Sequence, residues 1–263
     1  MNINPGDVIA ISSENRYEFA VIAFGTLFMN ATLAPLNVSY TPSEIQHAIN
    51  LSKPKYIFVS PASLKNVSKV LMNTQNLKFI RQAFVFGETS PVLGFEPLKH
   101  FLKTRAPFDE RFFIPMRTNL DKNVAVIGCS SGTTGLPKGV QLTQKNILTY
   151  FDRALSYDEN IYHKETAVLC VIPWTHAYGV FRLFITPVSK MKLVFLPKFE
   201  EKSFLSAIER FKVGSALLVP PLVVWLVKTP LTSKYDLSSM VEISCGAAPL
   251  SSQMEEALKK RLL

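Results

Sequence analysis

The sequence predicts an α/β fold made of two βαβ-type subdomains, in which mostly parallel sheets are flanked by helices. Short apolar segments typical of strands alternate along the chain with longer segments of helical periodicity. This alternation occurs twice, and residues 87–121, which contain four prolines, are expected to form an irregular connection between the two series. We therefore expect a first subdomain with this connection over residues 1–121 and a second subdomain over residues 122–263.

The first series reads as βαβαβ, which favours parallel strands with helices packed on the faces of the sheet. The run Thr41-Pro42-Ser43-Glu44 is typical of a helix start. The apolar run Phe19–Met29 is shorter than the roughly 18 residues of a membrane span, so a buried helix is expected. The predicted elements are strand Asp7–Ile11, helix Asn15–Met29, strand Thr32–Leu36, helix Ser43–Leu51, strand Lys55–Val59 and strand Ala83–Phe86.

The second series repeats the pattern and carries the residues of chemical interest. In open sheets of this kind, ligands bind beyond the carboxyl ends of the strands. Three features each lie just after a strand: the loop that begins at Ser130, His176, and the loop Cys245–Pro249. We expect them to converge on one crevice there. The predicted elements are strand Asn123–Cys129, strand Val140–Leu142, helix Gln144–Ser156, strand Ala167–Ile172, helix Tyr178–Ile185, strand Lys192–Leu196, helix Lys202–Phe211, strand Ser215–Val219, helix Pro221–Lys228, strand Val241–Ser244 and helix Ser251–Leu262.

The first of these loops, Ser130-Ser131-Gly132-Thr133-Thr134-Gly135-Leu136-Pro137-Lys138-Gly139, has the composition of a polyphosphate-binding loop. Glycines let backbone N–H groups approach an anion, hydroxyls add donors, and a lysine adds a compact positive charge. A plain surface loop is the alternative. The Walker A pattern does not fit, because Pro137 precedes the lysine and no hydroxyl residue follows it.

A nucleophile elbow is a competing interpretation of the same residues. Gly128-Cys129-Ser130-Ser131-Gly132 matches G-x-S-x-G literally, which would make Ser130 the nucleophile of a hydrolase. An elbow must lead directly into a helix, and the following Thr-Thr-Gly-Leu-Pro-Lys-Gly does not favour one. A catalytic Cys245 working with His176 is also conceivable, but no nucleophile signature surrounds that cysteine.

Five segments resemble, in their order along the chain, those of the adenylate-forming enzymes, which include acyl-CoA synthetases, 4-coumarate:CoA ligases and beetle luciferases. Besides the phosphate loop, the segment Pro173–Gly179 is similar to the family's P-x-x-H-x-x-G motif. Residues 245–251, Cys-Gly-Ala-Ala-Pro-Leu-Ser, are similar to its G-G-A-P-L-S adenine segment. The segments 216–221 and 234–239 lie between them, and the likeness is strongest to the insect luciferase-like branch. The resemblance implies that this chain is part of that family's large domain.

The resemblance implies a reaction in which a carboxylate attacks the α-phosphate of magnesium ATP, and CoA then displaces AMP from the acyl-adenylate. His176 and Lys138 would be the catalytic residues, with His176 shielding the developing charge. The expected substrate-binding residues are His176, Cys245 and Tyr178, which lies beside the acyl group or adenine unless it is a core side chain. The nucleotide-binding residues would be Ser130, Ser131, Gly132, Thr133, Thr134, Gly135, Lys138, Gly246, Ala247, Ala248 and Pro249.

Some family features are not found in this sequence. The Y-G-x-T-E loop that contacts AMP and magnesium, the ribose aspartate, and the small C-terminal domain with its catalytic lysine have no counterpart here. We therefore expect a fragment, incomplete at the N-terminus too, that is catalytically incomplete alone and holds no magnesium ligands. A non-catalytic nucleotide-binding remnant is the alternative, and luciferin oxidation is a further one. Ala247 stands where the family often has glycine, and the added methyl group is expected to narrow the slot for the purine ring.

Composition limits the other function classes. The 29 basic and 20 acidic residues give a formal charge of +9, but the charges are scattered, so nucleic acid is not an expected partner. Three widely spaced cysteines indicate reduced thiols rather than a metal site. The N-terminus has no signal-type segment, and no integral membrane segment is expected. These features favour an intracellular protein, in the cytoplasm or peroxisome by resemblance, although no C-terminal peroxisomal tripeptide is present.

Overall fold

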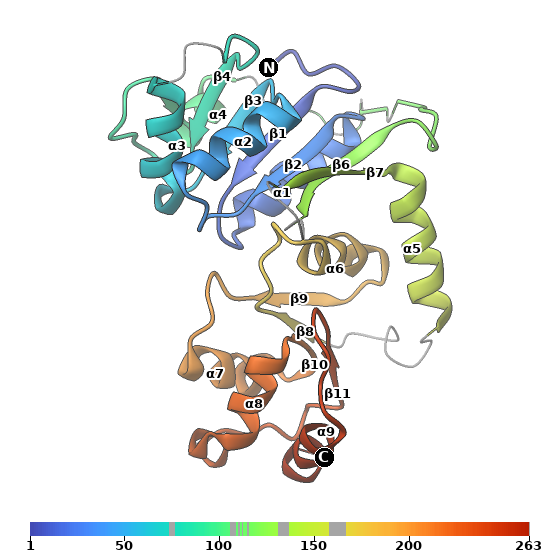
Figure 1. Cartoon of the computed structure of the whole chain (residues 1–263). Helices are drawn as coiled ribbons and strands as arrows, with labels where there is room; N and C mark the ends of the chain where they lie inside the picture. The colour runs from blue at the N-terminus through green and yellow to red at the C-terminus, as the bar shows by residue number, and fades with distance from the viewer. Residues whose placement is uncertain are drawn as a thin grey trace. The chain divides into compact units, whose positions relative to one another are not determined.

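The computed structural model describes residues 1–73, 77–105, 109, 111, 113–114, 116–130, 137–157 and 167–262 (Figure 1). The chain divides into two compact units, Met1–Thr149 and Tyr150–Leu263. This boundary lies later than the predicted division after residue 121. The reason is that the strands Val124–Ser130 and Lys138–Thr143, which the sequence assigned to the second subdomain, pair with the sheet of the first unit.

The described residues of the first unit contain one seven-stranded sheet in the order β5-β4-β3-β1-β2-β6-β7. Every neighbouring pair is parallel except β6 and β7, which form an antiparallel hairpin. Its strands are β1 (Val8–Ser12), β2 (Thr32–Leu36), β3 (Tyr56–Val59), β4 (Gln82–Val85), β5 (Phe95–Pro97), β6 (Val124–Ser130) and β7 (Lys138–Thr143). Its helices are α1 (Tyr17–Phe28), α2 (Pro42–Ser52), α3 (Pro61–Asn73), α4 (Leu98–Lys103) and the start of α5 (Gln144–Tyr157).

Helices cover both faces of this sheet, as expected for parallel strands buried on two sides. Alternate residues of β3 point to opposite faces, and its Ile57 joins α2 and α3 in one apolar cluster. On the other face, Phe58 stacks on Phe84 with ring centroids 4.8 Å apart, and Phe84 meets Phe101 of α4 edge-on. The predicted start of α2 is confirmed, and the structure shows a capping box there: Thr41 and Glu44 exchange side-chain and backbone hydrogen bonds.

The described residues of the second unit contain a four-stranded parallel sheet in the order β11-β10-β8-β9. Its strands are β8 (Ala167–Cys170), β9 (Lys192–Phe195), β10 (Val213–Leu218) and β11 (Glu242–Cys245). Its helices are α6 (Ala177–Val188), α7 (Glu201–Phe211), α8 (Pro220–Lys228), the 3₁₀ helix η2 (Pro230–Lys234) and α9 (Ser252–Leu262). Strand β10 is buried along its whole length, whereas β11 is an edge strand of this sheet.

The predicted irregular connection over residues 87–121 is wrong in part. Strand β5 pairs in parallel with β4, and α4 follows it directly. The edge position explains how a strand that ends at Pro97 is tolerated, because a proline there removes no donor that a central strand would need. Helix α3 was not among the predicted elements either, although Pro61 opens it and Leu64 and Val67 follow at helical spacing.

No helix in the described part of the chain has both the length and the apolar character that crossing a membrane requires. The apolar run predicted as a buried helix falls largely within α1. Phe19, Ala23 and Thr26 of α1 are buried, while Val21 and Phe28 are exposed on its outer side. Helix α1 therefore covers the sheet with one face only.

Candidate nucleotide-binding site

In the first unit, the hairpin of β6 and β7 holds the two ends of the predicted phosphate loop next to each other. Ser130, the last residue of β6, lies opposite Lys138, the first residue of β7, in the antiparallel register. The Ser130 hydroxyl donates a 3.5 Å hydrogen bond to the Lys138 carbonyl. Strand β7 begins two residues earlier than predicted, so Lys138 is held by a strand while its side chain stays exposed.

The structure describes only the two ends of this loop. Ser131, Gly132, Thr133, Thr134 and Gly135, all predicted to bind phosphate, lie outside the described residues. The chain is described again from Pro137 onwards, where it enters β7. An antiparallel strand at this point, rather than the helix of a nucleophile elbow, argues against the hydrolase interpretation of Ser130.

Cys129, next to Ser130 in β6, packs on the apolar cluster that includes Ile57 and is a structural residue. Burial raises the pKa of its thiol, and a hydrogen bond with Tyr40 lowers it by less. Tyr40 belongs to the turn after β2, and its backbone carbonyl accepts a 3.1 Å hydrogen bond from Asn66 of α3. The strand end that carries Ser130 is therefore supported from two neighbouring segments.

In the second unit, the predicted His176 lies at the N-cap of α6. Its backbone N–H donates to the Pro173 carbonyl at 3.1 Å, and its own carbonyl accepts from Val180 at 2.9 Å. Trp174, which is 1% exposed, packs on Phe195 of β9 and anchors the turn. The His176 side chain is exposed at a helix N-terminus, where backbone N–H groups favour a negatively charged ligand.

Gly179 explains the last position of the P-x-x-H-x-x-G motif. A Cβ atom on this residue would lie 2.2 Å from the carbonyl oxygen of Pro173 and 2.7 Å from its carbonyl carbon. Contacts this short are not possible for a real side chain, so only glycine lets α6 pack against the turn before it. The glycine thereby fixes where His176 is presented.

The predicted adenine segment follows β11 and is supported by Tyr178. The Tyr178 hydroxyl donates to the Ser244 carbonyl at 3.1 Å, and burial raises the pKa of Tyr178 to about 12. A Cβ on Gly246 would lie 3.4 Å from the Tyr178 ring, and the Gly246 N–H donates to Leu218 at 3.2 Å. Tyr178 thus packs beneath the segment, whereas Ala247, Ala248 and Pro249 are exposed.

Cys245 lines a cavity of about 380 Å³ between β11 and α9. The other walls are mainly apolar and include Ile243, Leu250 and Leu258. Burial raises the pKa of the Cys245 thiol, which opposes formation of the thiolate that a nucleophile needs. The interpretation of Cys245 as a catalytic partner of His176 therefore gains no support.

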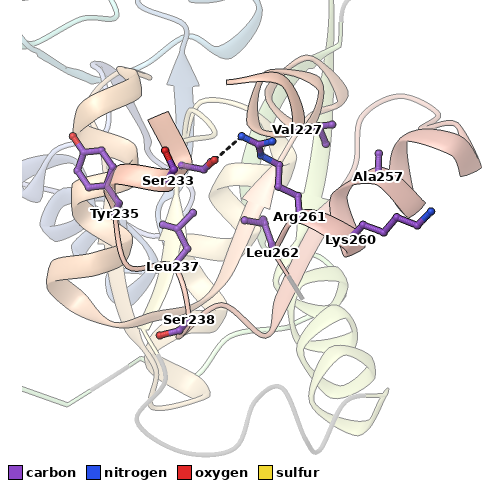
Figure 2. Close-up of a pocket in the computed structure, with 10 residues that line it drawn as sticks. Val227, Ser233, Tyr235, Leu237, Ser238, Ala257, Lys260, Arg261 and Leu262 are labelled. Carbon is purple, nitrogen blue, oxygen red and sulfur yellow. Dashed lines mark hydrogen bonds between the residues drawn. The ribbon is translucent and has the colours of Figure 1, made fainter. Parts of the chain in front are cut away.

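A second cavity, of about 650 Å³, lies among η2, α8 and α9 and contains none of the predicted site residues (Figure 2). Arg261 reaches across it and donates to the carbonyl of Thr229 and, at 2.7 Å, to the hydroxyl of Thr232. Figure 2 shows Lys260 directed away from Arg261. The arginine therefore ties α9 to η2, which is a structural contact.

The described residues contain no group of three or more histidine, cysteine, aspartate or glutamate side chains that could hold a metal ion. At the described ends of the predicted phosphate loop, the positively charged side chain is that of Lys138. Lys138, His176 and the adenine segment are candidates that their sequence motifs indicate. No motif indicates Tyr40, which is hydrogen-bonded to Cys129 of β6, or His47 of α2, which contacts Pro137 just before β7.

Ala247 has a φ of 70°, in the left-handed region that suits glycine. We expect Ala247→Gly to raise the free energy of unfolding by about 0.5–1 kcal/mol, because relief of backbone strain outweighs the greater freedom of the unfolded chain. Urea denaturation measures this change. Ala248→Gly, next to it and without a positive φ, should instead lower stability by about 0.5–1 kcal/mol. Equal losses in both variants would contradict the strain at Ala247.

Comparison with known proteins identifies the family of this chain. The AMP-binding enzyme family model matches residues 1–263. The chain is 35% identical over 262 residues to luciferin 4-monooxygenase from Photinus pyralis, covering 98% of this chain and 47% of that protein. It is 33% identical over 276 residues to a probable 4-coumarate–CoA ligase from Dictyostelium discoideum, covering 99% and 49%.

The fold agrees as well. The structure of a red-emitting luciferase from Phrixothrix hirtus superposes with a TM-score of 0.87 at 32% identity, covering 99% of this chain and 49% of that one. The chain spans about half the length of the curated relatives it matches. It belongs to the AMP-binding family of adenylate-forming enzymes, which contains luciferases and 4-coumarate–CoA ligases.

Proposed function

We propose that this chain binds ATP and takes part in activating a carboxylic acid as an acyl-adenylate, in the manner of an acyl-CoA ligase. One observation carries the proposal: the β6–β7 hairpin joins the ends of a hydroxyl- and glycine-rich loop and presents an exposed Lys138 at its exit. Membership of the family supports the reaction class. The identity of the acid, whether fatty, aromatic or a luciferin, is not part of the proposal.

The phosphates of ATP would bind at the loop between β6 and β7. Both reactants of adenylation are anions, so the site must neutralise charge before the carboxylate can approach the α-phosphate. Lys138 would neutralise the β- and γ-phosphates, which leave as pyrophosphate. Ser130 and the loop residues Ser131, Gly132, Thr133, Thr134 and Gly135 would add hydroxyl and backbone donors.

His176 would act at the α-phosphate and acyl group, where charge develops during the reaction. Its imidazole and the backbone N–H groups of the first turn of α6 both favour an anion. The adenine would lie on the Gly246–Pro249 segment, with Tyr178 as the support beneath that segment rather than as a direct ligand. In this proposal magnesium accompanies ATP and CoA is the acyl acceptor, in the cytoplasm or the peroxisome.

When the small C-terminal domain that the resemblance implies is supplied together with this chain, we expect His176→Ala to lower the rate of acid-dependent pyrophosphate exchange into ATP at least tenfold, because the variant removes charge stabilisation at the reacting phosphate. Its affinity for ATP should change less than the exchange rate. The measurement uses labelled pyrophosphate with a panel of fatty and aromatic acids, and calorimetry for ATP. His100→Ala, an exposed histidine of α4, is the matched control.

Three results would contradict the proposal. If the wild-type chain did not bind ATP, the assignment of the loop would be wrong. If it bound ATP but showed no exchange with any acid even when the small C-terminal domain was supplied, the alternative of a non-catalytic nucleotide-binding protein would replace it. A matching loss of exchange in His100→Ala and His176→Ala would show that the effect does not arise at the predicted site.

A further inference from the structure

Two side chains of α2 contact the exit of the phosphate loop on either side of Lys138. The His47 ring nitrogen Nε2 lies 2.7 Å from the carbonyl oxygen of Pro137. Leu51, one turn further along α2, lies beside Gly139: a Cβ atom added to Gly139 would lie 3.9 Å from the Cβ of Leu51. These contacts join segments about 90 residues apart in the sequence, within the first unit.

The chemistry of the His47 contact fixes its direction. A backbone carbonyl can only accept a hydrogen bond, so Nε2 of His47 must carry the proton and donate it. The Pro137 carbonyl and the Lys138 N–H belong to the same planar peptide unit. A hydrogen bond that holds this carbonyl therefore also sets the orientation of the Lys138 backbone, from which the side chain extends.

Helix α2 is a rigid base for this contact. Thr41 and Glu44 cap its first turn, and Ile45, Ala48 and Ile49 are buried against the sheet. His47 lies on the partly buried side of the helix between these anchors. The Pro137 ring restricts rotation about its own φ, so the carbonyl direction depends chiefly on the contact with His47 and on the pairing of β7.

We propose that His47 is a positioning residue that anchors the Pro137–Lys138 peptide and thereby directs Lys138 toward bound phosphate. The inference deepens the proposed function and rests on it for the identity of the ligand. His47 itself does not touch the nucleotide in this proposal. Its effect on binding must therefore pass through Lys138, which makes the inference testable separately from the loop assignment.

The experiment compares His47→Leu with His47→Gln. Leucine removes the donor, whereas glutamine places an amide N–H close to the position of Nε2. Without nucleotide, hydrogen–deuterium exchange of peptides covering residues 137–143 should become about tenfold faster in His47→Leu and stay near wild type in His47→Gln. Gln46→Leu, an exposed neighbour on α2, controls for adding an apolar residue to this helix.

The second arm measures ATP affinity. His47→Leu should weaken binding about five- to tenfold, and His47→Gln should restore most of it. In a Lys138→Ala background, His47→Leu should have little further effect, because its influence passes through that lysine. Far-ultraviolet circular dichroism and thermal unfolding verify that each variant folds.

The outcomes separate the two proposals. If hydrogen–deuterium exchange over residues 137–143 were unchanged in His47→Leu, the anchoring role would be overturned whether or not ATP binds. An equal loss of affinity from His47→Leu with and without Lys138 would overturn the route through the lysine. If wild type did not bind ATP, hydrogen–deuterium exchange over residues 137–143 could still be faster in His47→Leu and near wild type in His47→Gln. In that case the anchoring role of His47 would stand and the proposed function would fail.

Discussion

Lys138→Ala should weaken ATP binding at least tenfold, the largest effect on binding expected from one side chain of the described residues. A charge-assisted contact between an ammonium group and a phosphate oxygen contributes about 1.5–3 kcal/mol, and about 1.4 kcal/mol corresponds to a factor of ten. Because Lys138 begins β7 with its side chain exposed, alanine should leave the hairpin intact. Isothermal titration calorimetry at two salt concentrations measures the change.

The controls distinguish a specific contact from the loss of net charge. Lys65→Ala removes an exposed lysine from α3 in the same unit and should leave ATP affinity nearly unchanged. Lys138→Arg keeps the charge but replaces a compact ammonium by a planar guanidinium, so an intermediate affinity is expected. If Lys138→Ala and wild type bound ATP equally, the loop would have a different role. An equal loss in Lys65→Ala would indicate only non-specific attraction by the basic chain.

The sequence could predict most of the fold because strand and helix periodicity are local signals. Strand Thr32–Leu36 was predicted with the bounds observed, and most other elements differ by one or two residues. The omissions have physical causes. Strand β5 has three residues and is defined by its pairing with β4, a contact that no local pattern records. In the same way, β7 belongs to the first unit because it pairs with β6.

The site was predictable where function depends on residue type at fixed spacing. Lys138, His176 and Gly246 stand in motifs that can be read directly from the chain. For Tyr178 the sequence left open whether it lies beside the ligand or is a core side chain. Only the structure shows that its hydroxyl donates a hydrogen bond to the Ser244 carbonyl. His47 carried no signal at all, because its partner Pro137 is distant in the sequence and a lone histidine on a helix matches no motif.

Gly179→Ala should lower the free energy of unfolding by about 2–4 kcal/mol, the largest stability loss expected from adding a single methyl group. The added Cβ would lie 2.2 Å from the Pro173 carbonyl oxygen, so either α6 or the preceding turn must move. The turn cannot yield easily, because the His176 N–H is bonded to that same carbonyl and Trp174 is buried. Urea denaturation measures the loss of stability.

Gly25→Ala is the matched control for this substitution, since it adds the same methyl group to a glycine inside a helix. A Cβ atom on Gly25 of α1 would meet no neighbouring segment within 4 Å, so alanine should stabilise the protein by about 0.5–1 kcal/mol through its better helix propensity. The two variants are thus expected to change stability in opposite directions. Because the clash lies at the carbonyl that positions His176, Gly179→Ala should also lower acid-dependent exchange. Wild-type stability in Gly179→Ala would show that α6 does not approach Pro173 closely, and the structural reason for glycine in this motif would then be wrong.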